Sequence, residues 1–168
     1  MGKIVNVRID GRLIHGQVCT QWVHQVSGKK IFIIDDIIAK DAFLSQICVM
    51  ASPNGTSLEC ITCEEAAKRY NENEFDTPDN IFIIFQTLDM AIKAWDAGFH
   101  YPTLNFGTTL NKGEMVFTGV AAISIKKEHA PKLQEIANSG CVVTLQETPG
   151  APVVTWETVR AKCFPDVK

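Results

Sequence analysis

The stretches I-F-I-I-D at residues 31–35 and I-F-I-I-F at residues 81–85 decide the fold class of this 168-residue chain. Both runs are almost continuously apolar, whereas a strand with one face in water alternates apolar and polar side chains. Continuous short runs of this kind are typical of strands that are buried on both faces. Such strands occur in parallel sheets with helices on each side, so the two stretches predict an α/β fold.

Further strand and helix patterns extend outward from these two runs. Together with them, the strand candidates cover residues 3–8, 30–35, 57–61, 80–86, 103–106, 120–125 and 142–146. The helical patterns cover residues 16–26, 41–51, a segment capped by Thr62, and residues 88–97, 127–139 and 155–163, while residues 108–117 form a loop or short hairpin. This alternation predicts one three-layer α/β domain over residues 1–168, with a mostly parallel sheet of about seven strands and helices on both faces.

The composition narrows the classes of function. Sixteen basic and nineteen acidic residues give a net charge of -3, and no basic cluster favours a nucleic-acid partner. The six cysteines are scattered, unlike those of a secreted disulfide scaffold. No secretory leader or membrane-spanning run is visible, so we expect a cytoplasmic protein.

The stretch R-I-D-G-R-L-I-H-G-Q-V at residues 8–18 lies between the first strand and the first helix. In open α/β sheets, ligands bind outside the carboxyl ends of the strands, where this loop is expected. The amide groups of a helix that begins near His15 and Gly16 carry partial positive charge. Arg8 and Arg12 add full charges that can hold phosphate oxygens. The stretch therefore predicts an anion site.

His15 gives this loop a candidate nucleophile. The ordinary pKa of histidine lies close to neutral pH, so the ring is often neutral and needs no separate base to attack. Asp10 can fix the tautomer of His15 or orient Arg12. These residues alone leave an alternative open, in which His15 caps a helix and the arginines form surface ion pairs.

The same stretch resembles the signature of the B component (EIIB) of the mannose/fructose/sorbose family of the phosphoenolpyruvate-dependent sugar phosphotransferase system. The resemblance implies that His15 accepts a phosphoryl group from a phosphohistidine of the A component and donates it to a sugar carried by the membrane C and D components. It assigns the binding of that group to Arg12, Asp10, Arg8, Gly16 and Gln17. It also implies a phosphotransferase that uses a transient phosphohistidine without cofactor or metal, associates peripherally with the membrane transporter and forms a homodimer.

Outside this signature the chain departs from the family pattern at Thr108 and Leu88. The segment L-N-F-G-T-T at residues 104–109 resembles one that usually carries two glycines or Gly-Asn, and Leu88 stands where proline often follows the fourth strand. The identity of the sugar stays open, as does any contact of Gly107, Thr108 or Thr109 with phosphate or partners. Two rival functions are a non-catalytic regulatory module of the same fold and a small phosphate-ester-binding enzyme, although the glycine-rich phosphate loops of such enzymes are absent.

Several other side chains are weaker candidates for chemistry. Asp35 and Asp36 follow the second strand and can bind Mg²⁺ or act as acid and base, although a helix start explains them better. Cys60 and Cys63 have half the spacing of a zinc site, and a redox role requires Cys63 to be exposed. Thr87 is expected to cap a helix and can donate to phosphate. The remaining histidines, His24, His100 and His129, have no partners at a ligand spacing.

Overall fold

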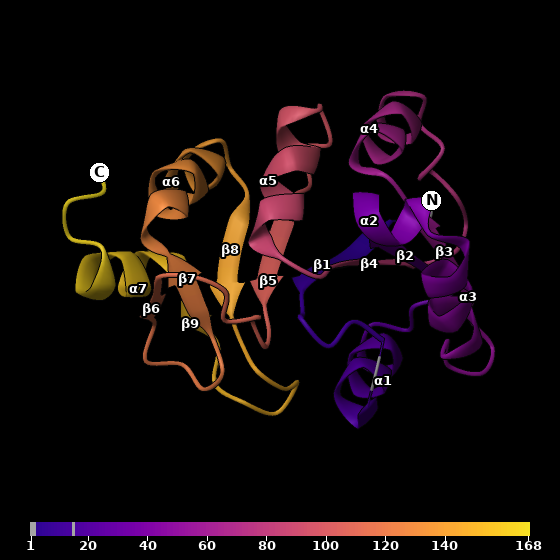
Figure 1. The fold of residues 1–168 in the computed structure, drawn as a ribbon, viewed down its shortest axis with the longest axis horizontal. Helices are drawn as coiled ribbons and strands as arrows, with labels where there is room; N and C mark the ends of the chain where they lie inside the picture. The colour runs from indigo at the N-terminus through magenta and orange to yellow at the C-terminus, as the bar shows by residue number, and fades with distance from the viewer. Residues whose placement is uncertain (1–2, 15) are drawn as a thin grey trace.

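The computed structural model describes residues 3–14 and 16–168, with only the backbone of residues 17–19, and it contains one seven-stranded sheet. The strand order is β3-β2-β4-β1-β5-β8-β9 (Figure 1), and only β9 runs antiparallel to its neighbour. The strands are β1 (Ile4–Ile9), β2 (Lys30–Ile34), β3 (Ser57–Ile61), β4 (Ile81–Phe85), β5 (Thr103–Phe106), β8 (Val142–Leu145) and β9 (Val154–Thr155). The predicted mostly parallel sheet is confirmed.

Helices cover both faces of this sheet, as predicted for a three-layer domain. One face packs on α1 (Gly16–Gln25), α2 (Asp36–Lys40) and α3 (Ala42–Met50). The other packs on α4 (Cys63–Asn71), α5 (Leu88–Asp96), α6 (Ala130–Asn138) and α7 (Trp156–Cys163), with the short 3₁₀ turn η1 (Lys127–His129) leading into α6. Among the described residues, no helix has the length and hydropathy needed to cross a bilayer.

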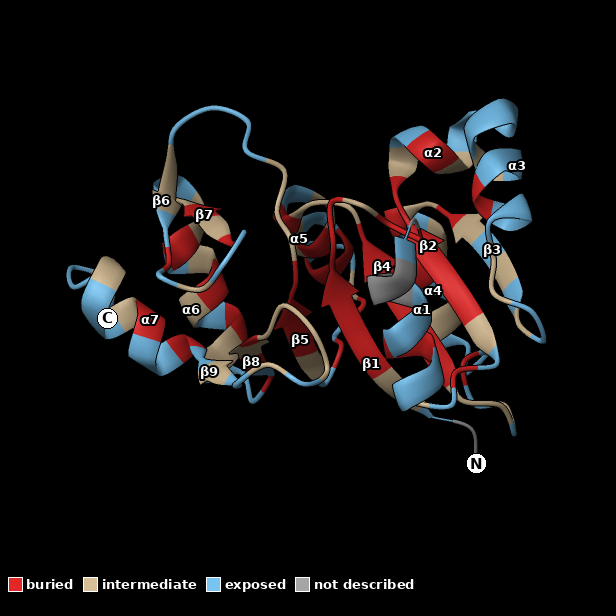
Figure 2. Cartoon of the chain, turned by 90° about the horizontal axis from the view of Figure 1, so that it is seen from below, coloured by how far each residue is buried: buried red, intermediate tan, exposed pale blue. Residues whose placement is uncertain are grey.

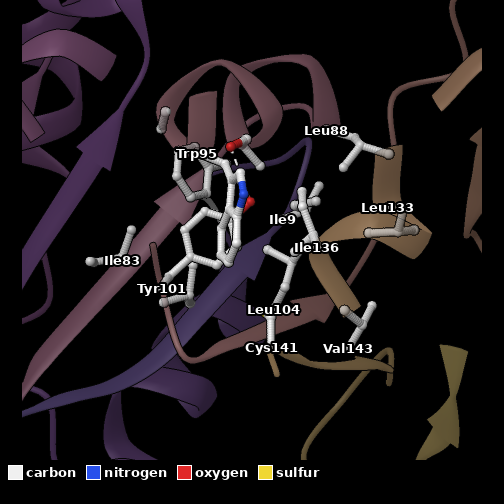
Figure 3. Close-up of a cluster of buried hydrophobic side chains, with 14 of the residues drawn as sticks. Ile9, Ile83, Leu88, Trp95, Tyr101, Leu104, Leu133, Ile136, Cys141 and Val143 are labelled. Atoms are coloured by element: carbon white, nitrogen blue, oxygen red, sulfur yellow. Dashed lines mark hydrogen bonds between the residues drawn. The ribbon is translucent and has the colours of Figure 1, made fainter. Parts of the chain in front are cut away.

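The continuous apolar runs are buried on both faces, as the opening stretches predict. Along β2, Phe32 and Ile34 join the core beneath α4 and α5, whereas Ile31 and Ile33 join the core beneath α1. Strand β4 divides its side chains between the two cores in the same alternating way. Figure 2 shows β1, β2 and β4 as the most deeply buried layer of the molecule. Figure 3 shows Trp95 and Tyr101 among the buried side chains of the larger core. The Tyr101 hydroxyl donates to the Ala91 carbonyl at 3.0 Å.

Local signals at the helix ends are largely confirmed. The hydroxyls of Thr62 and Thr87 accept amide hydrogens from the first turns of α4 and α5, as expected for N-caps. Gly98 and Gly140 end helices with φ of 111° and 100°, a left-handed backbone that favours glycine. The carboxylate of Glu65, at the third position of α4, accepts from Arg69 Nε at 2.8 Å.

The strand predicted at residues 120–125 is wrong in its extent and its sheet. Residues 119–122 form a turn in which Gly119 and Ala122 both have positive φ, and this turn leads into β7 (Ser124–Lys126). Strand β7 pairs antiparallel with β6 (Met115–Phe117) in a separate hairpin, so β9 supplies the seventh strand of the main sheet. Helix α2 was also missed, because five residues are too few to show a helical period.

Candidate functional site

The loop after β1 lies at the carboxyl ends of three neighbouring strands, β4, β1 and β5. The Asp10 amide donates to the Phe85 carbonyl at 2.9 Å, and the Gly11 amide donates to the Thr108 carbonyl at 2.7 Å. Gly11 is needed for this approach, because a Cβ there would stand 2.7 Å from the side chain of Leu110. Both ends of the loop's first turn are therefore fixed to the sheet, at the edge where ligands bind in such folds.

Asp10 is a fully buried carboxylate that holds Arg12. Its Oδ1 accepts from the Arg12 amide and from Arg12 Nε, each at 3.1 Å, and its Oδ2 accepts from Arg12 Nη2 at 3.3 Å. The Arg12 side chain is 37% exposed, so its guanidinium reaches the surface from a buried anchor. A guanidinium fixed in this way is arranged in advance for an anion with several oxygens.

Arg8, which the sequence predicts to help hold the anion, lies beneath the loop. Its side chain has no solvent exposure, and its Nη2 is 3.3 Å from Asp10 Oδ2. Nη1 donates to Asn105 Oδ1 and to the Gln146 carbonyl at 3.0 Å, while Nη2 donates to the Glu147 carbonyl at 2.8 Å. The burial of Arg8 and these bonds make it a support for Asp10 and for the loop that follows β8.

Arg8 is one member of a polar row that crosses three strands. Arg8 pairs in register with Asn105 on β5, and Asn105 pairs with Thr144 on β8. Asn105 Nδ2 donates to Thr144 Oγ1 at 3.0 Å. Gly107 comes directly after β5, and a Cβ there would stand 2.5 Å from Arg8 Cζ and 2.7 Å from Asp10 Oδ2. Asn105 was missed as a site residue, although one polar residue amid apolar neighbours in L-N-F is the signal that marks it.

His15, the expected phosphoryl carrier, lies outside the described residues, as does the side chain of Gln17. The residues on either side of His15 are described. Gly16 begins α1, is exposed and has a φ of 82°. Leu13 is buried with a φ of 55°, a left-handed conformation that costs a non-glycine residue about 1–2 kcal/mol. Strain of this kind often occurs at functional loops.

Comparisons with known proteins agree on one family. The family model described as "PTS system sorbose subfamily IIB component" matches residues 4–163. The chain belongs to this family. The sorbose-specific EIIB component of Klebsiella pneumoniae is 26% identical over 90% of this chain and 92% of its own. The solved structure of manxB from Thermoanaerobacter tengcongensis is 31% identical, with a TM-score of 0.87 over 98% of this chain and 99% of its own.

A third relative of this IIB component is a longer protein. The mannose-specific EIIAB component of Escherichia coli is 24% identical over 60% of this chain, and the match spans 31% of that protein. The IIB components of the phosphotransferase system are phosphoryl-transfer proteins, so transferase chemistry is the coarse function of this chain.

The acidic pair of this IIB component is used in folding contacts. Asp35 caps α2 by accepting from the amides of Ile37 and Ile38. Asp36 accepts from the Cys63 amide at 2.8 Å and contacts Lys93 Nζ at 2.5 Å. Burial alone would raise the pKa of Asp36, but the bonds from Lys93 and Cys63 outweigh it and lower the pKa. A helix start, the favoured interpretation, is confirmed for Asp35.

The cysteine pair does not meet the condition for redox chemistry. Cys63 is buried, and burial together with the nearby Asp36 carboxylate raises its pKa to about 12. Burial likewise raises the pKa of Cys60 to about 11. Neither thiol is a ready nucleophile, because only the thiolate reacts. Among the side chains that the structure describes, which leave out those of residues 1–2, 15 and 17–19, no cluster of three metal-ligating groups occurs.

A small cavity lies beside the loop of this IIB component. Its volume is about 60 Å³, and its lining includes Ile9, Gln86, Thr87, Lys112 and His129. Gln86 Nε2 donates to the Gly11 carbonyl at 3.4 Å, so the cavity wall and the loop are joined. A space of this size holds a few water molecules and is well below the volume of ordinary ligand pockets.

Proposed function

We propose that this protein is the phosphoryl carrier of a sugar-uptake system, with His15 as the residue that is transiently phosphorylated. In this role it accepts the group from a phosphohistidine of the A component and passes it to a sugar held by membrane C and D components. Family membership supports the chemistry, and a relative named as an EIIAB component supports pairing with an A component. The protein would act on the cytoplasmic side, beside its transporter.

One observation carries the assignment of the site. The buried carboxylate of Asp10 presents the guanidinium of Arg12 at the surface, three residues before His15 and four before Gly16, where the first amides of α1 begin. Arg12 and these amides would neutralise the charge on the transferred group, and Gly16 lets the backbone approach closely. Asp10 and Arg8 would act beneath them as positioning residues. Gln17 is proposed as a further contact.

The chemistry proposed here is two displacements at phosphorus. In the first, the bond to the donor imidazole nitrogen of the A component breaks while a bond to a ring nitrogen of His15 forms. In the second, a sugar hydroxyl oxygen attacks, the bond to His15 breaks, and the hydroxyl proton leaves to solvent. Such transfers depend mostly on positioning and charge stabilisation, which Arg12 and the start of α1 supply.

The sugar is proposed to be bound by the membrane partners. A phosphoryl carrier needs only to bring its group to a sugar that the membrane partners hold. The proposed substrate class is a hexose or an amino sugar, and the names of the relatives, sorbose-specific and mannose-specific, support a hexose.

The proposal is tested with the purified protein and an A component phosphorylated by its own donor system. We expect one acid-labile phosphoryl group per chain, mapped to His15 by peptide analysis and absent in His15→Gln. His24→Gln is a matched control, because His24 is an exposed histidine on α1 and should accept no label. Acid-stable label, or label that survives in His15→Gln, would contradict the proposal. Label without any sugar phosphate in membranes with C and D components would favour the regulatory module.

A further inference from the structure

Helix α3 exposes an unusual amount of apolar surface. Phe43 and Met50 are 71% and 78% exposed, and Leu44, Ile47 and Val49 are 38–44% exposed. Phe43, Ile47 and Met50 are spaced four and three residues apart, so they form one stripe along the helix. Figure 2 shows α3 as a largely exposed helix at one end of the molecule. We call these five residues the α3 face.

The α3 face carries no charge. Residues 42–50 read A-F-L-S-Q-I-C-V-M, without an acidic or basic side chain. Surface helices normally carry charged residues on the side away from the core, whereas only Cys48 of this helix is fully buried. An apolar face of this kind in water is typical of an interaction surface.

We propose that the α3 face is the contact between two copies of this chain, related by a two-fold axis. An uncharged apolar face is complementary to itself, because pairing two copies leaves no charge buried without a partner. The exposed apolar side chains of the α3 face have a surface area of roughly 500 Å². Each partner of a stable dimer buries about 800 Å², so the α3 face would supply a large part of that area. Ile37 on the adjoining α2 is 67% exposed and would extend the contact.

Helix α3 lies to one side of the loop after β1. Helix α3 packs on β3, the outermost strand, and β2 and β4 separate β3 from β1. At about 4.8 Å per strand, β1 lies roughly 14 Å from β3 across the sheet. A contact through α3 is therefore centred to one side of the loop after β1.

A lipid surface fits the same face less well. Helices that lie on anionic membranes combine an apolar face with lysines and arginines at its border. Helix α3 has no basic residue, and the neighbouring Lys40 is followed directly by Asp41, so the charges at its start cancel. The second copy is the occupant that these charges support.

Sedimentation velocity of the whole chain, from micromolar to several hundred micromolar, tests the proposal. We expect a concentration-dependent dimer for the wild type and a monomer for Phe43→Glu. An acidic side chain would be buried against its own copy, which should raise the dissociation constant at least about 100-fold. Met50→Glu should behave in the same way, and circular dichroism verifies that both variants are folded.

Phe117→Glu is the matched control, since Phe117 is 61% exposed on the separate hairpin, away from α3. It should dimerise as the wild type does. A wild type that stays monomeric at the highest concentration would overturn the proposal, as would a dimer that survives Phe43→Glu and Met50→Glu. Dissociation by Phe117→Glu would place the contact elsewhere. Because no A component or sugar is present, these results are independent of the proposed phosphoryl transfer.

Discussion

Arg8 and Arg12 contact the same carboxylate, Asp10, but they lie at different depths. Arg8 is completely buried and also bonds to the carbonyls of Gln146 and Glu147, which come from the loop after β8. Arg12 is partly exposed and bonds to Asp10 within its own loop. We therefore predict separable roles for two arginines four residues apart, the first in stability and the second in chemistry.

The first prediction compares the loss of each arginine. Arg8→Ala should lower the free energy of unfolding by about 3–5 kcal/mol, because it leaves a buried carboxylate and buried carbonyls short of partners. Arg12→Ala should cost clearly less than Arg8→Ala, because the Arg12 guanidinium is partly exposed and Asp10 keeps its pair with Arg8. It should nevertheless slow phosphoryl acceptance at least about 100-fold by removing charge stabilisation. Urea unfolding and single-turnover transfer measure the two effects.

Arg160→Ala is the control for this comparison. Arg160 pairs with Glu157 on α7, which packs beside β9 at the edge of the sheet, three strands from β1, so its loss should leave transfer unchanged. Equal stability losses for Arg8→Ala and Arg12→Ala, or transfer at the wild-type rate in Arg12→Ala, would show that the roles are not divided in this way.

The second prediction concerns Gly107, which lies against the pair of Arg8 and Asp10. A methyl group there would overlap Arg8 Cζ and Asp10 Oδ2, so Gly107→Ala must push the ion pair apart. We expect a loss of about 1–3 kcal/mol, as for other overpacked sites, together with slower transfer. Gly150→Ala should change neither quantity, because a Cβ at Gly150 meets no atom within 4 Å. Unchanged stability in Gly107→Ala would show that the pair adapts without cost.

At this scale the sequence predicted the identity of the charged groups better than their depth. The signature placed Arg8, Asp10 and Arg12 in one loop, and the structure places them in contact. The burial of Arg8 depends on Gln146 and Glu147, which are nearly 140 residues distant in the chain. A pattern within residues 8–18 carries no information on contacts with such distant residues. It therefore could not show that Arg8 is buried and Arg12 exposed.

Among the elements, α2 shows how a short helix depends on tertiary contacts. It has five residues, fewer than an isolated helix needs for stability. Asp35 caps its first turn, and Asp36 ties it to α4 through the Cys63 amide and to α5 through Lys93. The helix is therefore held by its neighbours, which explains why the sequence pattern alone did not predict it.

The third prediction uses the lowered pKa of Asp36. A carboxyl group whose pKa is lower in the folded than in the unfolded state stabilises the fold above its unfolded pKa, and this stabilisation is lost as pH falls through the folded value. Asp36→Asn should therefore cost about 1 kcal/mol near neutral pH, and the difference from wild type should shrink in acid. Urea unfolding at about pH 7 and about pH 3 measures it. A difference that grows in acid would contradict the assignment.

Asp79→Asn supplies the comparison for Asp36. Asp79 pairs only loosely with Lys30, at 3.7 Å, and both side chains are well exposed. Exposed pairs contribute little to stability, so this variant should unfold almost as the wild type does at either pH.

The element boundaries also show where sequence patterns work and where they fail. The strands buried on both faces and the capped helices were predicted within a few residues, because burial and capping act locally. The segment at residues 120–125 has strand-like composition but turns at Gly119 and Ala122. Its pairing with β6 is decided by that turn and by the Thr118 hydroxyl, which donates to the Ile123 carbonyl at 2.9 Å.

In the whole molecule, the candidate site lies where β1 meets β5, along a short seam of the sheet. Strand β1 pairs with β4 along most of its length, but its register with β5 covers only Arg8 and Ile9. Three further bonds join these strands and the loops after them. The Gly107 amide donates to the Ile9 carbonyl at 2.8 Å, and the Gly11 amide donates to the Thr108 carbonyl. Arg8 Nη1 donates to Asn105 Oδ1. Figure 1 shows β1 and β5 at the junction between the two halves of the fold. The residues that support the loop are thus the residues that join these halves.

The last prediction tests this coupling through Asn105. Asn105→Ala removes the acceptor of Arg8 Nη1 and the donor to Thr144, which should cost about 2–3 kcal/mol because the lost bond involves a buried charge. We expect amide exchange at Gly11 and Gly107 to accelerate more than exchange along β2 and β4, since the seam opens locally. Transfer should slow with it, because Asp10 and Arg12 lose their support. Thr144→Val keeps the bond from Arg8 and should disturb the seam less. Uniform acceleration across the whole sheet would mean that Asn105 stabilises the fold without holding the site.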